Sequence, residues 1–319
     1  MRPRLQPPQS EERLPRFDTP NILWFFGAIA TASTSIAVIG TVSSSYRGVW
    51  IFLVALVFAA AYTALAIVLR ASRWWIPSGL FATIVVTLVP AVGVGLERLI
   101  GVGPGSDSGT TIVYGTATPT YSTGSGFSGS IFVLGLLTIA AGMVVFSLTK
   151  FDFALAPVAL AVVVTALLFV PAVVDQTTGT DYAATSIVIG SVLVWIGLLL
   201  DARSKRRAAF WWHTVGLGSV ALGLVSFIGA GDEAAAWAAM LALGIVVLLL
   251  AVPLGRATWG VYGVAGGYAP LVHYVASGAG GWRLPLVLVF VSLSLLFLGF
   301  VLHLHGDALT ARARTRLRL

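Results

Sequence analysis

Hydroxyl and imidazole groups suited to binding a solute are concentrated in one mainly apolar segment, residues 258–277. This segment, TWGVYGVAGGYAPLVHYVAS, combines closely spaced glycines with a proline that removes a helical hydrogen bond. Backbone groups freed at membrane depth must be buried in protein or face a wet cavity. If the chain has a ligand site, we therefore expect it here. The candidate ligand or packing residues are Tyr262, Gly263, Gly267, Tyr268, Pro270, His273 and Tyr274.

The same residues also fit a helix that is kinked only in order to pack. The spacing Gly263-x-x-x-Gly267 lets a neighbouring helix approach closely, as in many pairs of membrane-spanning helices. The hydroxyl-rich stretch 31–35 could face this segment, although Ser and Thr hydroxyls often bond their own helix. A ligand site and a packing helix are both compatible with the sequence.

Residues for catalysis and metal binding are scarce. The chain has no cysteine, which excludes thiolate catalysis, disulfides and cysteine-based metal sites, and it has no HExxH, G-x-S-x-G or P-loop motif. His303 and Asp307 share a helix face, but one His and one Asp make an incomplete metal site. His213 follows two tryptophans and is expected at the membrane interface. We expect neither an enzyme nor a bound cofactor or metal.

The composition indicates a membrane protein. Of 319 residues, 58% are hydrophobic and 10% charged, whereas soluble domains carry about 25% charged residues. Apolar runs of roughly 20 residues, long enough to cross a bilayer, recur along the whole chain. They predict an all-α fold, a polytopic transmembrane helix bundle. The ten expected spans are 21–42, 49–69, 76–97, 129–148, 153–174, 183–200, 209–230, 234–254, 258–277 and 284–304.

The basic residues predict how these spans are oriented. If both termini lie in the cytoplasm, all of the 19 basic residues except Arg47, Arg98 and Arg283 fall on the cytoplasmic side, as the positive-inside rule requires. The alternative for the first span is a cleaved signal peptide, because Ala28-x-Ala30 resembles a cleavage site, but this span is too long for one.

This topology divides the chain into three regions. Residues 1–19 are expected to be a disordered cytoplasmic tail, 20–306 the transmembrane domain, and 307–319 a basic cytoplasmic tail. Within the transmembrane domain, loop 101–130 is rich in Gly, Ser and Thr and is expected to be flexible and extracytoplasmic.

Two tryptophan pairs follow arginines at the start of a span. Trp74 and Trp75 stand in SRWWIPSGL, and Trp211 and Trp212 stand in RRAAFWWHTVGLG. Indole has a large apolar body and one N–H donor, so it favours the headgroup level of a bilayer. We expect all four residues to be interface anchors, with stacking on a substrate as the alternative.

The similarity of these two stretches also suggests an internal repeat. It aligns span 3 with span 7, and the pair Ala156–Pro157 in span 5 with Ala269–Pro270 in span 9. An offset of four helices gives repeats of the same orientation, unlike the inverted repeats of many transporters. Helices 1–4 should then superpose on helices 5–8, with Trp74 on Trp211.

Three classes of function are compatible with these features. A structural or accessory membrane protein needs only packed helices and tails, and it fits the lack of mid-span charges. A transporter of a small neutral or weakly polar solute is the alternative, because ten spans with both ends inside resemble the drug/metabolite transporter superfamily in topology and length. No family motif supports that resemblance, and a parallel repeat departs from its inverted plan. An intramembrane enzyme is least favoured.

The expected partner is the lipid bilayer, with anionic headgroups at the basic tail 307–319. A membrane-protein partner or a homo-oligomer is also expected, but no nucleic acid, because the basic residues form short clusters between apolar runs. The prevalence of arginine over lysine, with abundant Ala, Gly and Val, suggests a bacterial protein of the plasma (inner) membrane.

Overall fold

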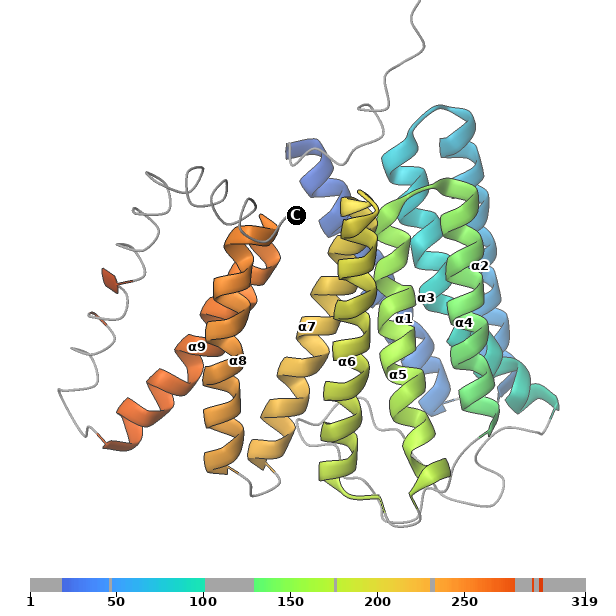
Figure 1. Cartoon of the computed structure of the whole chain (residues 1–319). Helices are drawn as coiled ribbons and strands as arrows, with labels where there is room; N and C mark the ends of the chain where they lie inside the picture. Colours follow the sequence, from blue (N-terminus) through green and yellow to red (C-terminus); the bar gives the residue numbers. More distant parts are fainter. Residues whose placement is uncertain are drawn as a thin grey trace, which may run out of the picture. The chain divides into compact units, whose positions relative to one another are not determined.

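The computed structural model describes residues 19–45, 48–100, 129–174, 177–229, 233–278, 289, 293 and 294. Within these ranges the chain folds into helices joined by short turns, without strands (Figure 1), which confirms the all-α prediction. A short 3-10 helix, Asp152–Ala154, precedes α5. The α-helices are α1 Thr19–Ser45, α2 Gly48–Ala71, α3 Trp75–Ile100, α4 Gly129–Thr149, α5 Leu155–Val173, α6 Gly179–Ala202, α7 Arg206–Gly229, α8 Glu233–Leu254 and α9 Ala257–Gly278.

Eight of these helices, α1 to α8, are long and apolar enough to cross a membrane. The chain is therefore a multi-pass membrane protein. Helix α9 has the length of a span, but its glycines, tyrosines and histidine make it less apolar, so the described residues support eight or nine spans where the sequence predicted ten. The tenth predicted span, 284–304, lies outside the described residues except at three positions.

The described residues also limit what can be said of the predicted tails and loop. Helix α1 begins at Thr19, which was assigned to the N-terminal tail, and α4 begins at Gly129, inside the predicted loop 101–130. Residues 1–18, 101–128 and the C-terminal tail 307–319 lie outside the described part.

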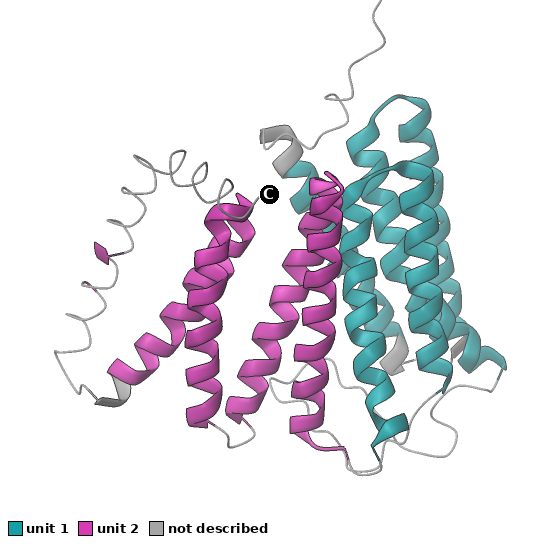
Figure 2. Ribbon diagram, in the orientation of Figure 1, with its two compact units in different colours: residues 1–176 teal, residues 177–319 magenta. Residues whose placement is uncertain are grey.

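The chain divides into two compact units, residues 1–176 and 177–319 (Figure 2). In unit 1, α2 packs on α3, α4 packs on α5, and α3 also contacts α4 and α5. In unit 2, α6 packs on α7, α8 packs on α9, and α7 also contacts α8 and α9. Helices α2–α5 and α6–α9 thus pair in the same order, at an offset of four helices. The sequence prediction grouped helices 1–4 and 5–8, so this pairing order begins one helix later than predicted.

The tight turns set the register of this repeat. Arg73 (φ 64°) and Ser204 (φ 60°) take left-handed backbone conformations after α2 and α6. In both turns the next residue, Trp74 or Lys205, donates its N–H to the carbonyl five residues earlier, the bond that closes a Schellman motif. Trp74 therefore corresponds to Lys205. Trp211 lies six residues further along, inside α7, so the register implied by the tryptophan pairs differs from that of the turns.

The proline match does not share a register either. Pro157 is the third residue of α5, where the first turn of a helix tolerates proline, whereas Pro270 lies in the second half of α9. The helix order repeats, but the local sequence similarities that suggested it do not superpose.

Small residues draw α6 and α7 together. Their buried positions recur every three or four residues, which places them on one helix face. A Cβ on Gly190 would lie 2.6 Å from the carbonyl oxygen of Gly216, and Ser186 and Ser219 each donate a hydroxyl to the other's backbone carbonyl at 2.8 Å. This close crossing determines which face of α7 packs against α6, and His213 lies on that face.

Candidate functional site

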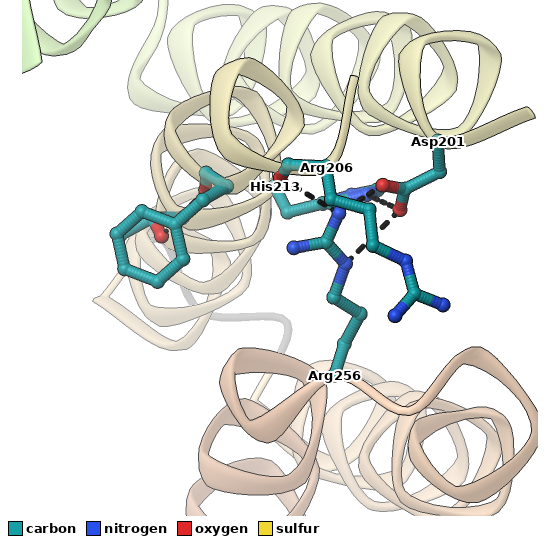
Figure 3. A network of polar contacts seen from close by, with 6 residues as sticks. Asp201, Arg206, His213 and Arg256 are labelled. Atoms are coloured by element: carbon teal, nitrogen blue, oxygen red, sulfur yellow. Dashed lines mark hydrogen bonds and ion pairs between the residues drawn. The ribbon is translucent and has the colours of Figure 1, made fainter. Parts of the chain in front are cut away.

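A charged cluster lies at one end of unit 2, where the α6–α7 and α8–α9 turns meet (Figure 3). Asp201 is the second-last residue of α6, His213 lies in α7, and Arg256 stands between α8 and α9. Gly255 precedes Arg256 with a φ of 61°, a conformation that glycine adopts without strain. The α8–α9 turn is thus shaped so that Arg256 points at the end of α6.

The carboxylate of Asp201 accepts hydrogen bonds from both neighbours. His213 Nε2 donates at 3.0 Å, Arg256 Nε donates at 3.2 Å, and Arg256 Nη2 donates to the other carboxylate oxygen. Arg256 Nη2 also donates to the backbone carbonyl of Arg206 at 2.8 Å. Asp201 and Arg256 side chains are only 15% and 13% exposed. Their charges therefore interact largely away from water, where each charge would be costly to bury without the other.

The imidazole of His213 is fully enclosed. Because a carboxylate only accepts, the ring carries a proton on Nε2. A Cβ on Gly197 would lie 2.7 Å from Nδ1 and Cε1 of the ring, and Trp259 meets the ring edge-on, with centroids 5.4 Å apart. Nδ1 has no hydrogen-bond partner among the described residues. Gly197 covers that edge of the ring, which leaves no room for a substrate.

The cluster is arranged to hold helices together. It joins the end of α6, the body of α7 and the α8–α9 turn through charge-assisted hydrogen bonds, which are stronger than neutral ones. Tyr262 of α9 adds a hydroxyl bond to the carbonyl of Thr214 in α7 at 3.0 Å. Across the described ranges, no three His, Asp or Glu side chains come close enough to hold a metal ion.

Several of the candidate residues in segment 258–277 lie in contacts between helices. A Cβ on Gly263 would lie 2.5 Å from the backbone nitrogen of Leu248 in α8, so glycine permits this close crossing. The backbone nitrogen of Gly267 also lies against α8, because a Cβ on Gly244 would lie 2.3 Å from it, whereas a Cβ on Gly267 itself would meet nothing within 4 Å. Pro270 is fully buried. Together with the Tyr262 bond, these contacts match the packing interpretation of the segment.

His273 and Tyr274 lie toward the opposite end of unit 2. The imidazole of His273 stacks on Trp237 of α8 with centroids 4.3 Å apart, and its Nε2 lies 3.5 Å from a carboxylate oxygen of Glu233. The Tyr274 ring meets His273 at 5.6 Å and is 43% exposed. His273 thus has partners on α8, and a ligand role for it stays a prediction.

Tyr268 borders a hollow on one face of α9. This hollow has a volume of about 600 Å³. Its lining residues all come from α9: Ala257, Gly260, Val261, Val264, Ala265 and Tyr268. Neither His273 nor Pro270 lines it, so the structure does not gather the seven predicted residues around one cavity.

The two tryptophan pairs differ in their surroundings. Trp74 and Trp75 are 55% and 38% exposed, and Arg70 lies 5.6 Å from the ring centre of Trp75. Trp211 and Trp212 are partly buried in α7. Their role as interface anchors stays a prediction.

The Asp201–His213–Arg256 cluster was missed by the sequence analysis. His213 was assigned to the interface, Arg256 was counted among the cytoplasmic basic residues, and Asp201 was assigned no functional role. The only available signal was one acidic residue at the end of a span beside several cations, which does not identify Arg256, 55 residues away, as its partner. Comparison with family models, curated proteins and solved structures finds no match to the chain.

Proposed function

We propose that this chain is an accessory or structural membrane protein without catalytic activity. The observation that carries the proposal is that the Asp201–His213–Arg256 cluster is closed on itself. The carboxylate is occupied by two donors, and the imidazole is covered by Gly197 and Trp259. A cluster built in this way stabilises the meeting point of two helical hairpins and leaves no reacting group accessible.

Other buried polar groups support the same function. Ser186 and Ser219 bond one another across α6 and α7. In unit 1, the hydroxyl of Ser78 in α3 donates to the carbonyl of Ala66 in α2 at 2.8 Å, and Ser35 and Tyr62 share a hydrogen bond of 2.7 Å between α1 and α2. Such interhelical bonds contribute about 0.6–2 kcal/mol each in membranes. These polar side chains thus serve helix packing.

The partner of an accessory protein is another membrane protein or a second copy of this chain. The test is extraction in a mild detergent, followed by size-exclusion chromatography and mass spectrometry of the purified sample. We expect a stable stoichiometric complex or a homo-oligomer. A monomer that carries no protein partner under several mild detergents would contradict the accessory function.

A transporter of a small neutral or weakly polar solute is the second candidate. It is favoured by the common pairing order of α2–α5 and α6–α9, because many transporters are built from two repeats. Saturable uptake into proteoliposomes that depends on the protein would support it. Uptake no faster than in empty vesicles, across a panel of sugars, amino acids and polyols, would reject it.

We further propose that the protein lies in the plasma membrane of a bacterium with both termini in the cytoplasm. Since the chain has no cysteine, single cysteines can be introduced and labelled from one side of intact cells. A cysteine at Ser204 should be protected from an impermeant maleimide, and one within 105–125 should react. The reverse pattern would overturn this orientation.

A further inference from the structure

The α6–α7 turn carries four cationic side chains in five consecutive positions. Arg203 caps the end of α6, Lys205 precedes α7, and Arg206 and Arg207 are its first two residues. We call these four residues the turn patch. Every residue from 203 to 207 is exposed. The left-handed Ser204 and the two Schellman hydrogen bonds make the turn short and defined, which holds the four charges close together.

The acidic residue that could neutralise the turn patch is already occupied. Asp201 binds His213 and Arg256, and none of the ion pairs among the described residues involves a side chain of the turn patch. Arg256 therefore has a second effect. It neutralises Asp201, the acidic residue that lies closest in sequence to the four cations of the turn patch. The patch keeps its positive charge and attracts an anion from outside.

The corresponding turn of unit 1 is different. Arg70 donates to the carbonyl of Leu148 at 3.1 Å and lies over the ring of Trp75, so its charge already has partners within unit 1. Within the turn itself, residues 72–74, Arg73 is the one cationic side chain, and it is exposed. The two turns thus have the same backbone geometry but differ in the number of cations without an internal partner. The cations are concentrated in the α6–α7 turn.

We propose that the turn patch binds the anionic headgroups of phospholipids in the leaflet that it faces. Helices α6 and α7 are both long and apolar enough to span a membrane, which puts the turn between them at the bilayer surface. Phe210, Trp211 and Trp212 follow in α7, and a rise of 1.5 Å per residue places them about 6–9 Å deeper than Arg206. Indole rings favour that level below the phosphates. The cations would thus lie at the level of the phosphodiester groups, and the aromatic rings at the level where the acyl chains begin.

The test compares two double variants that each remove two charges. R203Q/R207Q removes half of the turn patch without changing the Arg206 carbonyl that Arg256 uses. R73Q/R98Q removes two exposed, separate cations of unit 1 and is the control. Full-length protein in nanodiscs of phosphatidylcholine with increasing phosphatidylglycerol is analysed by native mass spectrometry for retained lipid. Correct folding of each variant is checked by circular dichroism and size-exclusion chromatography.

We expect wild type and R73Q/R98Q to retain phosphatidylglycerol with equal affinity, within a factor of two. R203Q/R207Q should bind roughly fivefold more weakly for each lost cation, and thus about 25-fold more weakly in total. High salt should reduce the difference. Equal losses in both double variants, or equal retention of phosphatidylcholine, would overturn the proposal. Displacement by soluble glycerol 3-phosphate at matching concentrations would also overturn it, because the ligand would then be a free phosphate.

Discussion

Replacing Asp201 with alanine should destabilise unit 2 more than removal of an exposed acid elsewhere in the unit. The carboxylate accepts three hydrogen bonds, from His213 Nε2 and from Nε and Nη2 of Arg256. Without it, the fully buried N–H of His213 loses its acceptor, and the largely buried guanidinium of Arg256 keeps only the backbone carbonyl of Arg206. Removing one partner of a buried ion pair costs about 3–5 kcal/mol, and the residual exposure of both side chains favours the lower end, about 3 kcal/mol.

This cost can be measured by unfolding the protein with increasing SDS in dodecylmaltoside micelles, followed by circular dichroism. Glu233→Ala is the matched control, since Glu233 is 58% exposed and makes only long contacts, so we expect a loss below about 1 kcal/mol. The double variant D201A/R256A should lose about 0.5–3 kcal/mol less than the sum of the single variants, because it leaves no unpaired guanidinium. Equal unfolding of D201A and E233A, or strict additivity, would refute the argument.

Three further substitutions test helix packing in the same unfolding assay. Gly197→Ala should cost about 1–3 kcal/mol, because its Cβ would lie 2.7 Å from the His213 ring, whereas Gly27→Ala, with nothing within 4 Å, should not destabilise. Gly263→Ala should destabilise the α8–α9 pair and Gly267→Ala should not, since only the first Cβ would meet another helix; equal effects would argue against this crossing. Ser186→Ala should cost about 0.6–2 kcal/mol by removing its bond to Ser219, and a wild-type midpoint would show that this bond contributes nothing.

The number and limits of the helices were largely determined by the sequence. A bilayer requires about 20 apolar residues per span, and nine of the ten spans predicted from the apolar runs match α1 to α9 within a few residues. The tenth, 284–304, falls almost wholly outside the described residues. An offset of four helices was inferred from tryptophan and proline matches, whose register the turns do not share. Runs of apolar residues determine where helices lie, but short similarities between them say little about register.

Which polar side chains meet was decided by the tertiary structure. Asp201, His213 and Arg256 look like ordinary residues at span ends, and they join only because small residues bring α6 and α7 into close contact and the α8–α9 turn ends beside them. His273, singled out in the sequence for its position in a glycine-rich segment, stacks on Trp237, a contact that the sequence did not indicate. Helix formation depends on local hydrophobicity, whereas the pairing of buried polar groups depends on helix rotation and spacing, which the linear order of residues does not specify.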